Sequence, residues 1–267
     1  MSLTYIYELL ALSQWNFTPF TIGLFCLAAF IVGLTKAGLP GGTIVAVPLM
    51  AMVIPPKISV GVMLPIFMVA DVFSISFWHR HAQRHYCFPY LLFIGLGIVG
   101  ASFVVKAIDD KTLGVIIGWL ILFLITLNLF TEILRKKSKD KDLSPPPDKP
   151  PLYFSALFGI LTGAVSTLAN AGGPIISLYL MLSRRDKFQF LGITAVCAFF
   201  MNWGKVPVFL SAGSINANTL KLSITAIPMV ALGAFMGHKI AEVIPQKVFK
   251  NVVFILAFAA SLSLILR

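Results

Sequence analysis

Charged side chains are scarce in this sequence. Asp, Glu, Lys and Arg together make up 12% of its 267 residues, against about 25% in soluble domains. Hydrophobic residues make up 58%, and they recur in apolar runs of about 20 residues, the length that a transmembrane helix needs. This composition excludes a water-soluble enzyme or binding module. The sequence predicts an all-α integral membrane protein.

Acidic residues and cysteines are also few. The 10 Asp and Glu stand against 21 Lys and Arg, which gives a formal net charge of +11. In a soluble protein this charge would indicate nucleic acid. Here the positive charges lie in short segments between apolar runs, so membrane topology explains them better and we expect no nucleic-acid partner. The 3 cysteines, Cys26, Cys87 and Cys197, form no CxxC pair, so we predict neither a metal site nor a disulfide framework.

Motifs for ATP-driven or catalytic chemistry are missing. The chain has no P-loop, so ATP-driven pumping by this chain alone is not expected. It has no HExxH motif and no nucleophile–base set, so we predict that it is not an enzyme and uses no cofactor. His79, His81 and His85 have no carboxylate beside them, and we interpret them as part of a basic loop near lipid head groups rather than a zinc site. No basic region precedes the first apolar run, so we expect no cleaved signal peptide.

One polar linker separates ten apolar segments into five and five. The linker, residues 135–151, is rich in Lys, Asp and Pro, which is typical of a solvated connection. We predict a first membrane repeat at 17–134, a cytoplasmic linker, and a second membrane repeat at 152–267. The ten segments are 18–36, 42–54, 58–78, 88–106, 112–134, 152–169, 173–182, 189–210, 219–238 and 249–266.

The two halves are alike at an offset of 131 residues. An ordered set of matches of this kind predicts an internal duplication, a known signature of transporter folds. Because each half has five segments, the second half would enter the membrane from the opposite side, so the repeats would be inverted. The matches are Gly41-Gly42 with Gly172-Gly173, Gly61 with Gly192, Asp71 with Asn202 and, after a two-residue insertion, Gly100-Ala101 with Gly233-Ala234 and Lys106 with Lys239.

The distribution of Lys and Arg predicts the orientation in the membrane. If the linker is cytoplasmic, most of the 21 Lys and Arg residues lie on the cytoplasmic side, in agreement with the positive-inside rule. Both termini are then periplasmic or extracellular. An alternative makes segments 42–54 and 173–182 re-entrant, which gives eight crossings and moves Arg80 and Arg84 to the outer side. We rank this alternative second.

Segments 42–54 and 173–182 are short for membrane spans, because as helices they reach about 15–20 Å and the hydrocarbon core is about 30 Å thick. Each follows a Gly-rich loop, so we expect each helix to begin inside the membrane. In an inverted fold the two helix starts can meet near the midplane, where free N–H groups and positive dipole ends attract anions. The alternative is that the glycines serve only close helix packing.

Few polar side chains lie inside the predicted spans. Lys36, Lys205 and Asp71 leave a surplus positive charge if all are ionised, which fits an anionic substrate, and Asp71 could pair with either lysine and also titrate. Three alternatives stay open: Lys36 snorkels to the interface, Asp71 and Lys205 form a purely structural pair, or Asn202 only bridges helices. The predicted coupling residue is Asp71, and the predicted substrate-binding residues are Lys36, Gly41, Gly42, Thr43, Asn170, Gly172, Gly173, Asn202 and Lys205.

The same stretches carry a family resemblance. They are residues 33–42 followed by 47–51, residues 64–71, residues 169–174, and Asn202 with Lys205. With these residues the chain resembles the sulfite exporter TauE/SafE family, also called the 4-toluene sulfonate uptake permease family, over about residues 17–266. One subgroup usually has Lys-Gly-Gly where this chain has Lys36-Ala37-Gly38, and members often carry histidine at the position of Asn170.

The resemblance implies a multi-pass transporter of the bacterial inner membrane for sulfite, a sulfonate or a related organosulfur or organic anion. We expect a proton- or ion-coupled secondary transporter that works by alternating access, and a passive anion channel is the alternative. The expected partners are the small anion and the lipid bilayer. A homodimer stays open as the assembly.

Overall fold

The structure is a computed structural model that describes residues 17–38, 43–107, 150–183 and 187–243, together with isolated positions between 109 and 126. Within these ranges every regular element is a helix, so the predicted all-α class is confirmed. Before the linker the helices are α2 (Pro19–Gly38), α3 (Thr43–Val53), α4 (Pro56–Trp78), the short 3-10 helix η2 (His79–His81) and α5 (Arg84–Ala107). After it they are α7 (Leu152–Ala169), α8 (Gly173–Leu182), α9 (Lys187–Ser211), α10 (Ala217–Thr225) and α11 (Ile227–Val243).

Five of the described helices are long and apolar enough to cross a membrane, namely α2, α4, α5, α7 and α9. The pair α10 and α11, bent by 45°, is apolar enough to make a sixth if the two helices form one span. Large apolar side chains point outward from these helices, including Phe20, Phe88 and Phe103, each at least 73% exposed. Such exposure is unfavourable in water and expected in lipid. The protein is a multi-pass membrane protein.

The helices follow the predicted segments closely. α7 and α8 occupy the predicted residues 152–169 and 173–182, and α2, α3, α4, α5 and α9 differ from their predicted segments by a few residues at their ends. Most of the predicted segment 112–134, all of 249–266 and nearly all of the linker lie outside the described residues.

The predicted segment 219–238 contains two helices, because the chain bends there between α10 and α11. Pro228, at the second position of α11, has no N–H to donate and disfavours helical backbone in the residue before it. α10 has its own start signal, since the side chains of Asn216 and Thr219 form a capping box.

Two pairs of helices pack in parallel through glycines, and each pair joins the two sides of the linker. In the pair α2–α11, a methyl group added to Gly33 would overlap the carbonyl oxygen of Val230, and one added to Gly38 would overlap that of Gly237. In the pair α5–α7, a methyl group at Gly163 would overlap the carbonyl oxygen of Ile94. Small residues allow this close approach of membrane helices.

Helices α4 and α9 pack against each other in opposite directions. Gly61 near the start of α4 lies against Ser214, just beyond the end of α9, and Gly192 near the start of α9 lies against His81, just beyond α4. Gly61 and Gly192 are one of the pairs that the offset of 131 matches. An inverted duplication would produce this exchange of contacts, although the duplication itself stays a prediction.

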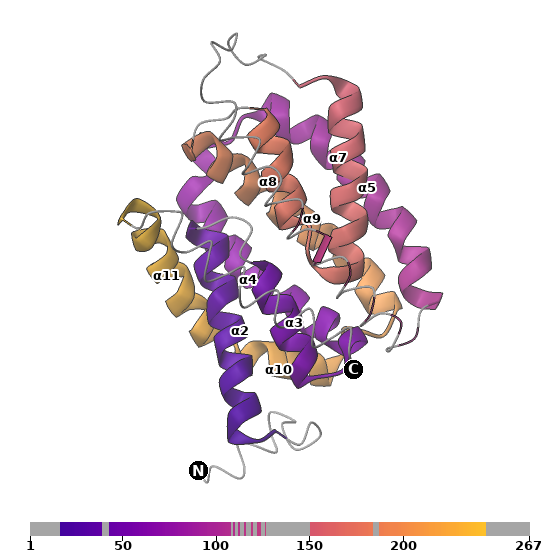
Figure 1. Ribbon diagram of the computed structural model, residues 1–267, viewed down its shortest axis with the longest axis vertical. Coiled ribbons are helices and arrows are strands. Elements are labelled where there is room, and N and C mark those ends of the chain that lie inside the picture. The colour runs from indigo at the N-terminus through magenta and orange to yellow at the C-terminus, as the bar shows by residue number, and fades with distance from the viewer. Residues whose placement is uncertain are drawn as a thin grey trace.

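Buried apolar side chains form two large clusters. One draws mainly on α2, α3, α4, α10 and α11, and the other mainly on α5, α8 and α9. Figure 1 shows α2, α4 and α11 on one side of the molecule and α5, α7, α8 and α9 on the other. The protein is therefore built as two packed bodies that meet along α4 and α9.

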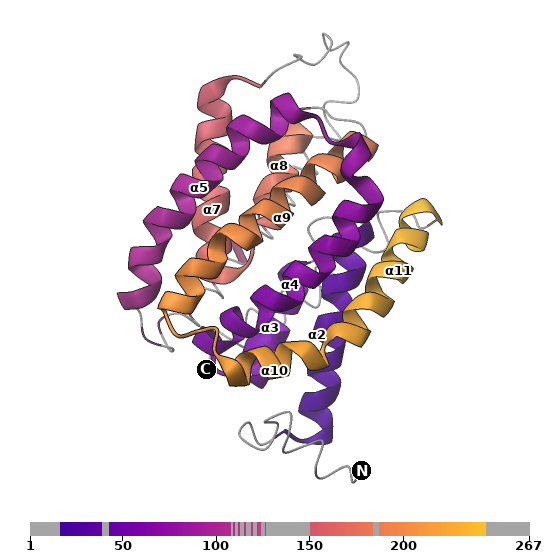
Figure 2. The same ribbon diagram turned by 180° about the vertical axis from the view of Figure 1, so that it is seen from behind.

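Helices begin and end at two opposite ends of the molecule. The starts of α5 and α7 lie at the end that is uppermost in Figures 1 and 2, whereas α10 and the start of α2 lie at the opposite end. The connection after α4 therefore lies at the same end as the residues that follow the linker. The predicted topology with ten crossings requires Arg84 to lie at the same end as the start of α7. Which end faces the cytoplasm stays a prediction.

Candidate functional site

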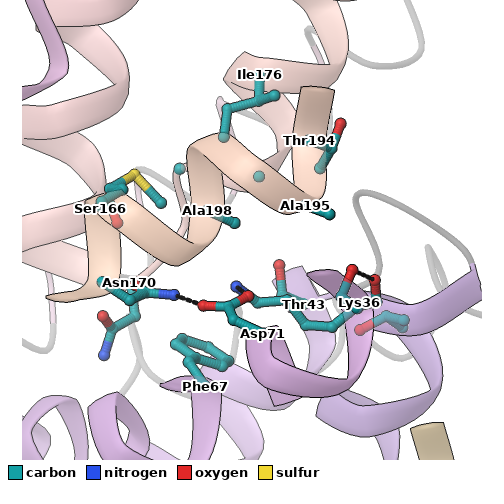
Figure 3. A pocket seen from close by; sticks show the side chains of 16 residues that line it. Lys36, Thr43, Phe67, Asp71, Ser166, Asn170, Ile176, Thr194, Ala195 and Ala198 are labelled. Carbon is teal, nitrogen blue, oxygen red and sulfur yellow. Dashed lines mark hydrogen bonds and ion pairs between the residues drawn. The ribbon is translucent and has the colours of Figure 1, made fainter. Parts of the chain in front are cut away.

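A buried cavity lies between helices from the two sides of the linker. Its walls come from α2, α3 and α4 on one side and from α7, α8 and α9 on the other. Figure 3 shows Asp71 and Lys36 on one side of it and Ala195 and Ala198 of α9 on the other. The lining residues are Thr35, Lys36, Thr43, Phe67, Asp71, Ser74, Ser166, Asn170, Gly172, Gly173, Ile176, Thr194, Ala195, Ala198, Met201 and Asn202.

The cavity is small. It leaves about 30 Å³ for the centres of water-sized spheres, and one buried water needs about 10–15 Å³, so there is room for about two or three waters. In this state the cavity therefore has room for only a few non-hydrogen atoms.

Two short helices begin at this cavity. α3 has 11 residues and starts at Thr43, and α8 has 10 residues and starts at Gly173. The starts adjoin each other, because a methyl group added to Gly173 would lie 3.2 Å from Thr43 Oγ1. The first N–H groups of a helix have no acceptor within it, and the positive end of the helix dipole lies there. Both helices therefore direct positive potential into the cavity.

Asn170 holds the break between α7 and α8 in place. It caps α7 with a left-handed backbone, φ 50°, a conformation that asparagine tolerates better than most residues. Its Nδ2 donates to the carbonyl oxygen of Val60 at 2.8 Å, and its Oδ1 accepts from Lys205 at 2.7 Å. The amide nitrogen and the amide oxygen both have partners, so Asn170 connects the break between α7 and α8 to α4 and α9.

Asp71 joins three helices. Its Oδ1 pairs with Lys36 Nζ of α2 at 2.6 Å, and its Oδ2 accepts a hydrogen bond from Asn202 Nδ2 of α9. The Asp71 side chain is fully buried and that of Lys36 is 12% exposed. One turn along α4, Ser74 donates to the carbonyl oxygen of Lys36 at 2.8 Å. Of the two lysines that the sequence offered to Asp71, Lys36 makes the ion pair, and it lies in the cavity wall.

Lys205 lies behind the cavity wall rather than in it. Its side chain is fully buried, and its Nζ donates to Ser166 Oγ at 2.9 Å, to the Ser166 carbonyl oxygen at 3.2 Å and to Asn170 Oδ1 at 2.7 Å. An ammonium has three N–H donors, and these three acceptors use them all. Two of them belong to the last turn of α7, where the helix dipole is negative and favours a cation.

A protein-family model matches almost the whole chain and identifies the family. The model of the sulfite exporter TauE/SafE family matches residues 25–264, which cover the cavity and all of its walls. The chain belongs to the sulfite exporter TauE/SafE family. This confirms the family that the sequence resembles, and membership implies a membrane protein that transports an anion. No curated protein and no solved structure matches the chain.

Most of the residues predicted for the site of this TauE/SafE protein come together. Two of them, Gly41 and Gly42, lie outside the described residues. Lys205 contacts the wall through Ser166 and Asn170 without lining the cavity. The predicted residues that do line the cavity are Lys36, Thr43, Asp71, Asn170, Gly172, Gly173 and Asn202.

The sequence reading missed several polar residues of this TauE/SafE cavity. Ser74 stands three positions after Asp71 and Ser166 four positions before Asn170, so helical periodicity could have placed both on the same faces. Thr194 stands eight positions before Asn202 on α9, which is two steps of the same periodicity. In the described part of the chain, Thr194 Oγ1 and Asn202 Oδ1 are buried without a hydrogen-bond partner. The cavity therefore holds polar groups with capacity for further hydrogen bonds.

Proposed function

We propose that this TauE/SafE protein is a secondary transporter for a small anion, with sulfite, a sulfonate or a related organic anion as its substrate. The observation that supports this most is a single buried cavity at which two helix N-terminal ends and a lysine converge from different helices. Broken helices that present such ends to a buried substrate are a recurring arrangement in secondary transporters.

The anion would be held by donors on both sides of the cavity. The starts of α3 and α8 adjoin the cavity, and helix starts of this kind bind oxyanions. Thr43 can add a hydroxyl donor, and Lys36 can add a charged one. Gly173 has no side chain, so an anion can approach the N–H of Gly173 closely.

The charge that an anion meets would depend on Asp71. The charge of Lys205 is stabilised by Ser166 and Asn170 at the end of α7, so Lys205 would act by position and by its field. The balance in the cavity wall is then between Lys36 and Asp71, which neutralise each other as an ion pair. Protonation of Asp71 would leave the positive charge of Lys36 without its counter-ion. Binding of an anion would then be coupled to binding of a proton.

Alternating access would use the two packed bodies. The glycine contacts of α2 with α11 and of α5 with α7 bring the two helices of each pair close together, so each pair is expected to move as a unit. The cavity lies where the bodies meet. Movement of one body against the other would open it to either side of the membrane.

The wider architecture in this proposal is an inverted duplication in the bacterial inner membrane, with both termini outside the cytoplasm. Its support is the contact of Asp71 with Asn202 and the exchanged contacts of Gly61 and Gly192, all at positions that the offset of 131 relates.

Stabilisation by ligands tests the substrate class. Purified protein is heated with sulfite, sulfate, thiosulfate or methanesulfonate, and a bound anion at a hundred times its Kd adds about 2.7 kcal/mol to the free energy of unfolding. We expect at least one anion to raise the Tm of the wild type. Lys36→Gln should lose the increase, and Lys221→Gln, at an exposed lysine of α10, should keep it. If no anion of the panel raises the Tm, the proposed substrate class is wrong.

A further inference from the structure

Asn202 uses only one end of its amide. Nδ2 donates to Asp71 Oδ2, whereas Oδ1 has no partner in the described part of the chain, although the residue is 1% exposed. A buried acceptor without a donor is unfavourable. The missing donor should therefore come from a neighbour in another state or from a bound molecule.

Asp71 can supply that donor when it carries a proton. A carboxylic acid donates through its O–H and accepts through its C=O, and a primary amide can meet both at once. The Asn202 amide would then donate to one oxygen of Asp71 and accept from the other. An ionised Asp71 can only accept, which is the arrangement that leaves Asn202 Oδ1 unpaired. An asparagine therefore suits both protonation states of its neighbour.

We propose that Asn202 is the positioning residue for a proton on Asp71, and that the protonated pair is the state in which the cavity holds its anion. This inference rests on the transport function proposed above and deepens it. When Asp71 takes up a proton, Lys36 loses the carboxylate that lies 2.6 Å from it and becomes available to the anion. One proton and one negative charge enter together, so the net charge of the cavity does not change.

The groups around Asp71 agree with this assignment. Lys36 contacts it directly, and Lys205, one turn from Asn202 on α9, is held by Ser166 and Asn170. No described residue of α3 is charged or titratable. The remaining such groups with described side chains on elements that pack against α4 make no ion pair or hydrogen bond with Asp71; they are Cys26 of α2, Cys197 of α9, His79, Arg80 and His81 of η2, Lys221 of α10, and His238 and Lys239 of α11.

The first test measures protons and anions together. Purified full-length protein in liposomes is given sulfite, sulfate, thiosulfate or methanesulfonate, and anion uptake is followed with the pH of a weakly buffered medium. Methanesulfonate keeps its single charge over the whole pH range. For a carried monoanion we expect one proton per anion and no dependence on membrane potential. Above the pH at which Asp71 takes up its proton, the apparent affinity should fall about tenfold per pH unit, because one proton is linked to binding.

Variants separate the proton carrier from its positioning residue. Asp71→Asn keeps a neutral amide that can pair with Asn202, so anion binding should persist and become independent of pH. Asn202→Leu removes the partner of the acid, and the infrared C=O band of protonated Asp71, which anion binding produces in the wild type, should move toward that of a free acid. Ser76→Ala, at an exposed position of α4, is the control and should leave the band and the pH profile unchanged.

The possible results are distinct. Uptake of a monoanion with one proton per anion, a band absent in Asp71→Asn and a band shifted in Asn202→Leu support the inference. Uptake without protons, or a band that Asn202→Leu does not shift, overturns it and leaves the proposed transport function standing. Absence of uptake for every anion overturns the proposed function, and the inference with it.

Discussion

Asn202 donates a hydrogen bond to Asp71, and the two residues stand 131 positions apart, which is the offset at which the halves of the sequence align. Equivalent residues of two inverted repeats meet only where the repeats adjoin their symmetry axis. Thr43 and Gly173, at the starts of α3 and α8, lie around the same cavity. The cavity is thus where an inverted duplication would bring its related positions together.

Removal of Lys36 alone should destabilise the protein more than removal of both charges of the Lys36–Asp71 ion pair. Lys36→Met leaves a fully buried carboxylate without its cation, which should cost about 3 kcal/mol in the free energy of unfolding. Adding Asp71→Asn removes the unpaired charge and should restore most of that loss. Thermal melting of both purified variants checks this expectation. Equal Tm values for the single and double variants would show that the pair contributes no specific stability.

Close helix contact should make Gly33 intolerant of any side chain. Gly33→Ala places a methyl group on the carbonyl oxygen of Val230, so α2 and α11 must separate. Gly23→Ala on the same helix meets nothing within 4 Å and should be neutral or gain up to about 1 kcal/mol, because alanine favours a helix over glycine. The yield of monodisperse protein and its Tm should fall for Gly33→Ala only. Equal behaviour of the two variants would contradict the parallel α2–α11 contact.

Lys205 should be needed for transport although it does not line the cavity. Lys205→Ala leaves Ser166 Oγ and Asn170 Oδ1 without their donor, and the start of α8 loses its anchor to α9. We expect anion uptake to fall at least about tenfold, equivalent to roughly 1.4 kcal/mol, with normal amounts of protein in the membrane. Lys221→Ala, at an exposed site, serves as the control. Undiminished uptake by Lys205→Ala would remove this residue from the site.

The two ends of the molecule should face opposite sides of the membrane. A reporter protein fused after Arg84 is expected in the cytoplasm, because this loop lies at the same end as the start of α7 (Figure 1). A reporter fused after Ser214, which packs at the other end of α4 against Gly61, is expected outside. Both reporters on one side, or the two sides exchanged, would refute the predicted topology.

The sequence was sufficient for most helices and for the core of the site. Apolar runs bounded by Gly-rich loops predict α7 and α8 to the residue, because a polar backbone break inside a membrane is costly and leaves a clear signal. The offset of 131 residues matched Asp71 with Asn202 as equivalent positions of the two halves, but it did not predict the hydrogen bond between them. The bend between α10 and α11 was missed, although Pro228 marks it, because hydrophobicity continues across the bend.

Side-chain partners could not be read from the sequence. Lys36 and Lys205 are the same residue type, so the sequence does not tell them apart. Only the packing of α2 and α7 against α4 and α9 decides which of them contacts a carboxylate. Phe67, four positions before Asp71, and Thr194, eight positions before Asn202, share helix faces with predicted residues, but the spacing does not show that these faces line a cavity. Contacts between helices far apart in the chain determine these roles, whereas local periodicity determines the helices themselves.

Solute counterflow tests most directly whether the cavity carries an anion. Liposomes that contain the protein are loaded with an unlabelled anion of the panel and placed in a low concentration of the same anion in labelled form. Transient accumulation of label above equilibrium is predicted for the wild type and for Gly204→Ala, whose added methyl group meets only an ordinary contact with Ile98. Gly173→Val, which fills the space beside Thr43 Oγ1, should abolish it. Label that only equilibrates in the wild type would indicate a channel, and accumulation by Gly173→Val equal to the wild type would contradict the site.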